Sequence, residues 1–170
     1  MPVKYVYHYR PCMSSSLPNI KVGRDAEADM DPEDLPVYEV EYLNYQAIPE
    51  HGWDIDDEDL FEKAAAADLS EKDHGSFEIR GTRYILDGAE DADQKWPFEC
   101  RAASCAYCTM ILYEGDVKMD MDLILTDEEV EERNIYLSCQ SIPKSDEVKI
   151  VYNAMHHDYL QENIVGVREV

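Results

Sequence analysis

Four of the five cysteines lie in one part of the sequence, at Cys100, Cys105, Cys108 and Cys139. The first three form a C-x4-C-x2-C run, and the fourth follows after 30 intervening residues. Four thiolates at this spacing can bind two irons bridged by two sulfides, with a short loop wrapped around the sulfurs. Small side chains let such a loop approach closely, and this loop has them at Ala102, Ala103, Ser104 and Ala106. We therefore expect one 2Fe-2S cluster as the cofactor, ligated by these four cysteines.

Other uses of the thiols stay open at this point. Structural zinc also accepts four thiolates, but its usual site is built from two short C-x2-4-C units, whereas Cys139 stands alone. A redox-active pair at Cys105 and Cys108 would need a neighbouring βαβ pattern, which the sequence lacks. Inert buried thiols are common singly, yet four at this spacing are not expected by chance. Cys12 has no second thiol or histidine nearby, and we interpret it as a free thiol.

The chain is strongly acidic, with 38 acidic against 15 basic residues and a formal net charge of -23. Residues 1 to 24 differ, because they hold four basic residues and no acid. At low salt such a field repels nucleic acid and anionic membranes, so neither is expected as a partner. At molar salt the Debye length is about 3 Å, and the acids then act locally, through hydration. This composition suits a cytoplasm of high ionic strength, or simply a very soluble acidic protein.

No stretch has the roughly 18 uncharged residues that a membrane span needs, and the N-terminal residues 3–8 are too short and polar for a signal sequence. We therefore expect a soluble, cytoplasmic protein. Its 170 residues suffice for one domain with extra length. Clustered thiols in an intracellular chain point to metal rather than to a disulfide framework.

Two segments precede the cysteine loop. Residues 1–36 carry five prolines and a Ser14–Ser16 run, and we expect a flexible N-terminal extension. From Val37 apolar and acidic residues alternate, which predicts a strand. Residues 49–75 hold ten acids, and their apolar residues recur at helical spacing, which predicts an acidic helical insertion; those residues are Leu60, Phe61, Ala64 and Ala65.

The remaining elements alternate irregularly along the chain. We expect strands at 76–79, 110–113, 135–137 and 148–152, and helices from Tyr84 to about 93–96, at 127–132 and at 154–164. Thr126 and Glu129 form a capping box at the start of the helix at 127–132. Residues 98–108 are predicted to be a loop. Short strands interrupted by unequal helices favour an α+β fold over regular βαβ units.

The sequence resembles the plant-type 2Fe-2S ferredoxins of halophilic archaea, over about residues 37–164. The similarity rests on the run from Trp96 to Cys108, the Thr126–Val130 segment, the Asp146–Asn153 segment, the Val40–Tyr45 strand and the acidic stretch around Gly52. The cysteine spacing is itself the known signature of the plant-type group. The resemblance implies a β-grasp (ubiquitin-like) core with an inserted acidic helical subdomain, within a ferredoxin domain at 37–170.

The resemblance also implies an activity and a site. One iron would be held by Cys100 and Cys105, and the other by Cys108 and Cys139. The protein would be a one-electron carrier and not an enzyme, a monomer that shuttles low-potential electrons. Its implied donors are 2-oxoacid:ferredoxin oxidoreductases, and its acceptors are ferredoxin-dependent reductases.

Two positions in the loop depart from the family pattern. Ala103 stands where glycine is usual, and Glu99 where a small residue is usual. If position 103 needs a positive φ, alanine there costs on the order of 1 kcal/mol. A carboxylate beside Cys100 disfavours an added electron. These departures motivate one alternative, a dedicated 2Fe-2S donor to one oxygenase or assembly system. A second alternative, from a different class, is a zinc-stabilised acidic interaction module.

Overall fold

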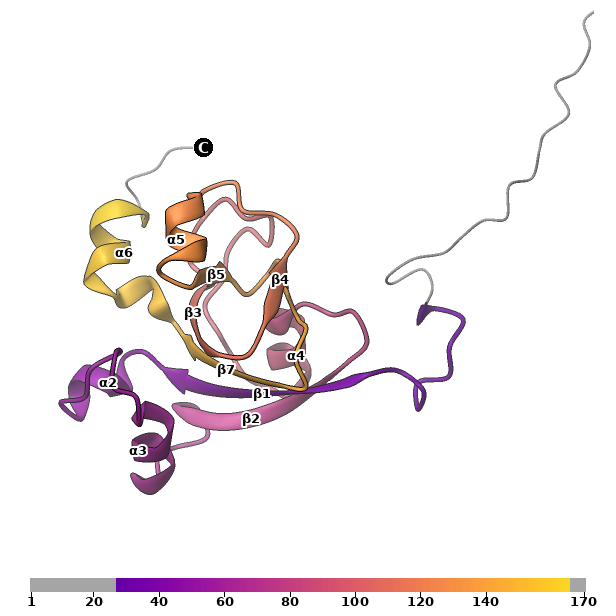
Figure 1. Ribbon diagram of the computed structural model, residues 1–170, viewed down its shortest axis with the longest axis horizontal. Helices are drawn as coiled ribbons and strands as arrows, with labels where there is room; N and C mark the ends of the chain where they lie inside the picture. Colours follow the sequence, from indigo (N-terminus) through magenta and orange to yellow (C-terminus); the bar gives the residue numbers. More distant parts are fainter. Residues whose placement is uncertain (1–26, 166–170) are drawn as a thin grey trace, which may run out of the picture.

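Strands and short helices alternate in residues 27–165, the part of the chain that this computed structural model describes (Figure 1). Five strands form one mixed sheet in the order β2-β1-β7-β3-β5, and β4 pairs with β6 in a second sheet. The strands are β1 (Val37–Asn44), β2 (His74–Arg80), β3 (Thr109–Glu114), β4 (Val117–Met119), β5 (Ile135–Leu137), β6 (Ser141–Pro143) and β7 (Glu147–Tyr152). The helices are α2 (Ala47–Glu50), α3 (Leu60–Ala66), α4 (Ile85–Asp91), α5 (Asp127–Glu131), the 3-10 helix η1 (Ala154–His156) and α6 (Asp158–Asn163). The expected α+β class is confirmed.

Strand β1 lies inside the large sheet and has the alternating pattern that its sequence predicts. It runs antiparallel to β2 and parallel to β7, and β3 then runs antiparallel to both β7 and β5. Val40 and Tyr42 of β1 are buried in the main core, whereas Leu43 points to a second apolar cluster on the other side. One strand therefore supplies residues to two cores, because successive side chains of a strand point to opposite faces.

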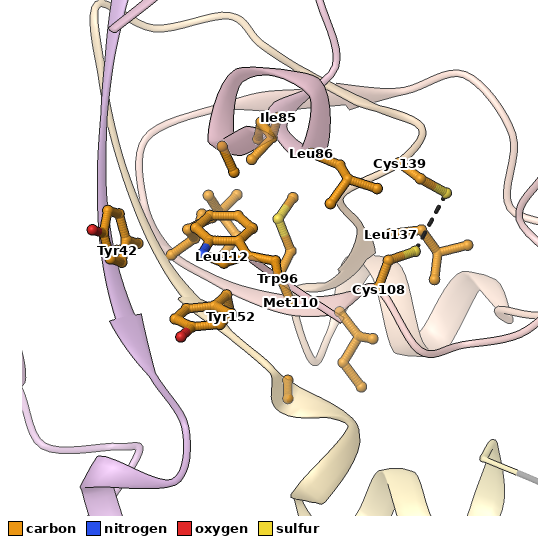
Figure 2. Packing of buried hydrophobic residues seen from close by; sticks show 14 of the residues in the cluster. Tyr42, Ile85, Leu86, Trp96, Cys108, Met110, Leu112, Leu137, Cys139 and Tyr152 are labelled. Atoms are coloured by element: carbon orange, nitrogen blue, oxygen red, sulfur yellow. Dashed lines mark hydrogen bonds between the residues drawn. The ribbon is translucent and has the colours of Figure 1, made fainter. Parts of the chain in front are cut away.

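Helix α4 packs on the main-core face, close to β2. Its buried residues are Ile85, Leu86, Gly88 and Ala89. The contact is close at Gly88, where a Cβ atom would lie 2.6 Å from Cγ1 of Ile79 in β2. Figure 2 shows residues of the same core, among them Trp96, which stacks on Tyr152 with 4.5 Å between the ring centroids. This core extends to Cys108 and Cys139.

The acidic segment between β1 and β2 packs on the opposite side, through α2 and α3. Leu60, Phe61 and Ala64 are buried, as their spacing predicts, but Ala65 is exposed. Their cluster includes Leu43 and Val151 of the large sheet. The acidic face of the segment is thus left to solvent.

Three tyrosine hydroxyls of the large sheet also hold this segment. Tyr42 donates to the carbonyl of Glu71 at 2.5 Å, Tyr152 to that of Lys72 at 2.7 Å, and Tyr113 to that of Asp57 at 2.7 Å. All three acceptors are backbone atoms. The attachment therefore depends on the path of the main chain more than on the acidic side chains.

The structure corrects the sequence-based description of four elements. Residues 154–164 do not form one helix: His157 has extended backbone (φ -67, ψ 135), and its Nδ1 accepts the Tyr159 N–H, which starts α6 anew. Helix α2 was not predicted, because Pro49 indicated a stop; proline is tolerated in a first helical turn. Strands β4 and β6 have three residues each, too few to show a period.

Cys12 and residues 1–26 lie outside the described residues, so the predicted flexible extension at 1–36 stays a prediction. Within 27–36, the Glu27 carboxylate accepts the backbone N–H of Thr82 at 2.6 Å. The Pro36 carbonyl accepts the N–H of Gly81 at 2.8 Å. Across residues 27–165, every helix is too short or too polar to cross a membrane.

Candidate metal centre

The pairing of β3 with β5 brings two of the cysteines together. Cys108 directly precedes β3, Cys139 lies two residues beyond β5, and the ladder pairs Thr109 with Leu137. Ser138 continues the pairing, since its N–H and its hydroxyl both donate to the Cys108 carbonyl at 3.0 Å. The two sulfur atoms consequently lie 3.3 Å apart (Figure 2). Both side chains are buried at the end of the main core.

The other two cysteines lie in the loop between α4 and β3. Between Cys100 and Cys108 this loop turns at three residues with left-handed backbone, Arg101 (φ 53), Ala103 (φ 56) and Ala106 (φ 59). The turns direct backbone N–H groups at the Cys100 sulfur, from Ala102 at 3.3 Å and Ser104 at 3.4 Å. Ala103 therefore has the positive φ that glycine adopts easily, and alanine in this conformation carries strain of about 1 kcal/mol.

Hydrogen bonds set the acidity of the cysteines. Burial alone would raise the pKa of Cys100, but hydrogen bonds from Ser104 and Ala102 outweigh it and lower the pKa to about 6. The hydrogen bond from Cys108 lowers the pKa of Cys139 to about 7 and raises the pKa of Cys108 itself. Burial raises the pKa of Cys105. Two of the four groups therefore favour the thiolate form, which is the form that binds metal.

Structural zinc is the alternative that the sequence left open for the four thiols. Within residues 27–165, no three cysteine, histidine or acidic side chains converge as a site for one ion. Structural zinc needs four ligands on one centre, whereas the two irons of a 2Fe-2S cluster divide four thiolates between them.

Two polar residues beside the cysteines were missed by the sequence analysis. Arg101 forms ion pairs with Asp87 at 3.0 Å and with Glu90, both on α4, and its guanidinium lies 4.2 Å from the Phe98 ring centre. Gln140 follows Cys139, and its Nε2 donates to the Arg101 carbonyl at 2.9 Å. Each residue adjoins a candidate ligand, which was the only signal that the sequence offered. Phe98 is 38% exposed, and Tyr107 is half-buried.

Comparison with known proteins identifies the group to which this chain belongs. A family model described as a 2Fe-2S iron-sulfur cluster binding domain matches residues 71–144, a range that includes all four cysteines. Ferredoxin-1 of Haloarcula marismortui is 52% identical over 126 residues, which cover 74% of this chain and 98% of that protein. Ferredoxin-2 of the same organism is 41% identical over 117 residues, which cover 69% of this chain and 84% of that protein.

A more distant relative is a larger protein, and the match covers only part of it. The ferredoxin reductase component of a 3-ketosteroid-9-alpha-monooxygenase from Mycolicibacterium smegmatis is 31% identical over 101 residues, which cover 58% of this chain and 28% of that protein. The matches cover 98% and 84% of the two Haloarcula proteins, and the cysteine spacing is shared with the plant-type group. The chain therefore belongs to the plant-type 2Fe-2S ferredoxins, which carry electrons on one 2Fe-2S cluster.

Proposed function

We propose that Cys100, Cys105, Cys108 and Cys139 ligate the cluster, the first two on one iron and the last two on the other. The observation that carries this proposal is the β3–β5 register, which brings the Cys108 and Cys139 sulfurs to 3.3 Å. The lowered pKa of Cys100 and of Cys139 agrees with a thiolate site.

The loop residues fit such a group. Ala103 and Ala106 are 1% and 2% exposed, so the loop packs closely at these two small residues. The N–H groups of Ala102 and Ser104 point at Cys100 and stabilise negative charge on its sulfur. When bound, the cluster supplies one-electron oxidation and reduction. The protein holds the sulfurs, limits solvent around them and adjusts their charge.

The proposed role is to carry low-potential electrons, near −400 mV for plant-type ferredoxins, without making or breaking bonds in a substrate. The proposed donors are 2-oxoacid:ferredoxin oxidoreductases, and the acceptors are ferredoxin-dependent reductases. The similarity to a ferredoxin reductase component supports redox proteins as partners in general. We propose that the protein acts as a monomer in a high-salt cytoplasm, which its net charge of -23 favours.

The fold fits a β-grasp ferredoxin core with an inserted acidic helical subdomain. In this proposal residues 37–170 form the ferredoxin domain, and the segment at about 49–75 is the insertion. Support comes from the apolar cluster that α2 and α3 form apart from the main core. Residues 1–36 would be an added extension.

Spectroscopy of single cysteine variants tests the ligand assignment. The wild-type protein should show visible charge-transfer bands that bleach with dithionite and a rhombic one-electron EPR signal. Cys100→Ser, Cys105→Ser, Cys108→Ser and Cys139→Ser should each lose or shift these signals, because oxygen is a poorer ligand for iron in such clusters. Cys12→Ser is the matched control and should leave the spectrum unchanged. Wild-type spectra in any one of the four variants would exclude that residue as a ligand.

A further inference from the structure

Strand β2 forms one edge of the large sheet (Figure 1). It stands first in the strand order β2-β1-β7-β3-β5, and β1 is its one strand partner within residues 27–165. An edge strand keeps a row of backbone N–H and C=O groups with which a further strand can pair. The edge of β2 is seven residues long, His74–Arg80, so it can take a strand of ordinary length.

The two faces of the sheet differ in chemistry at this edge. Phe77 and Ile79 of β2 are buried in the main core, whereas Glu78 between them is exposed on the other face. Glu78 lies opposite Glu39 of β1, and Glu39 lies opposite Glu147 of β7, so three carboxylates form a row across the sheet. Like charges placed opposite one another on neighbouring strands destabilise a sheet. A strand that joins β2 therefore meets an apolar face on one side and an acidic row on the other.

One segment of the sequence outside residues 27–165 has the complementary pattern. Residues 3–10 contain no proline, no glycine and no acid, and they consist mainly of valine and tyrosine, which favour strands. Alternate residues are apolar or aromatic, and most of those between them are basic. The first set is Val3, Tyr5, Tyr7 and Tyr9, and the second includes Lys4, His8 and Arg10. Strict alternation of this kind predicts a strand with one apolar and one basic face.

The path of the chain keeps this segment within reach of β2. The described part of the chain begins at Glu27, whose carboxylate accepts the backbone N–H of Thr82 at 2.6 Å. Thr82 lies two residues beyond Arg80, where β2 ends. The sixteen residues at 11–26 join Glu27 to the segment at 3–10, and they can span up to about 50 Å. Because β2 spans only about 23 Å, the segment can reach its whole length in either direction.

We propose that residues 3–10 form a sixth strand of the large sheet, paired with the edge of β2. Its aromatic face lies on the side of Phe77 and Ile79, and its basic face lies beside Glu78 and offsets the row of carboxylates. A segment tethered by a short linker has an effective concentration in the mM range, which favours this chain's own segment over that of a second copy. The flexibility predicted for the extension then belongs to the linker at 11–26. The inference does not depend on what the cysteines bind.

The experiment measures amide hydrogen exchange of β2, residue by residue by NMR, in the full-length cluster-loaded protein. The wild type is compared with the double variant Val6→Pro/Tyr7→Pro. Neighbouring amides of a strand point to opposite sides, so one of the two prolines must remove a donor to β2. We expect the β2 amides that point away from β1 to exchange about tenfold faster, or more, in the double variant. Ser15→Pro/Ser16→Pro, in the linker, is the matched control and should exchange as the wild type does.

Two results overturn the proposal. Equal exchange of these β2 amides in the wild type and in Val6→Pro/Tyr7→Pro shows that residues 3–10 do not pair with the edge. Slow exchange in the wild type that becomes faster on dilution, with a dimer in light scattering, shows that the strand comes from a second copy. Slow exchange that is independent of protein concentration and is lost in the double variant supports the proposal. Equal visible spectra of the three proteins show that the ferredoxin domain stays folded in each.

Discussion

Removing the Tyr152 hydroxyl tests how the acidic segment is held on the sheet. Tyr152→Phe keeps the ring, which stacks on Trp96 at 4.5 Å, and deletes only the donor to the Lys72 carbonyl. Tyr152 is 4% exposed, whereas Lys72 is exposed, so the released carbonyl can bind water. The loss should therefore be that of one neutral hydrogen bond, about 1 kcal/mol in the free energy of unfolding. For a chain of this size that lowers the melting temperature by about 2–4 °C.

The measurement is thermal unfolding of the cluster-loaded protein at constant salt, followed by circular dichroism, together with amide hydrogen exchange of residues 69–73. Exchange there should increase, because opening this part of the segment no longer costs a hydrogen bond. Tyr38→Phe is the matched control, since the Tyr38 hydroxyl makes no hydrogen bond within the described residues. A loss under about 0.3 kcal/mol would mean that the Tyr152 hydroxyl makes no net contribution to stability. A loss above about 3 kcal/mol would mean that no water binds the Lys72 carbonyl in place of the hydroxyl. Either result refutes this account of the attachment.

Two further predictions concern packing and pH. Gly88→Ala should lower the free energy of unfolding by about 1–3 kcal/mol, because its new Cβ would lie 2.6 Å from Ile79 and would push α4 off β2; urea unfolding measures this, and an unchanged midpoint would contradict the close packing. Burial tends to raise the pKa of Asp73, but hydrogen bonds from Ser70 and Asn44 outweigh this and hold the pKa below its ordinary value of 3.8. A depressed pKa stabilises the fold fully above the ordinary value, and this stability is lost as the pH falls through the folded-state pKa. Between about pH 5 and 3, the urea midpoint should thus fall less steeply in Asp73→Asn than in the wild type; equal slopes would show that Asp73 is not responsible.

The sequence was most informative where a pattern lies within a short stretch of the chain. The cysteine spacing predicted the cofactor, and alternation at Val40 and Tyr42 predicted β1 with its buried face. The capping box of Thr126 and Glu129 is present as expected, with Glu129 N–H donating to the Thr126 hydroxyl at 3.3 Å. These signals are local, so neighbouring residues suffice to produce them.

Features that depend on distant contacts were not predictable in the same way. Which strand pairs with β3 decides that Cys108 meets Cys139, and no local period encodes that choice. The roles of Arg101 and Gln140 arise from partners elsewhere in the chain. The break at His157 was hidden because buried residues on both sides continue the apolar pattern. Ala103 was recognised as unusual, but only the backbone showed its left-handed conformation.

The two pairs of cysteines differ in how they are attached, and this has a consequence for sequence change. Cys108 and Cys139 take their places from a strand ladder, so their separation is fixed by the backbone pairing of β3 and β5. Cys100 and Cys105 take theirs from a loop that turns on Arg101, Ala103 and Ala106. Loop positions tolerate substitution better than paired strands do. Substitutions among related proteins can therefore change the loop around Cys100 and Cys105 while the separation of Cys108 and Cys139 stays the same.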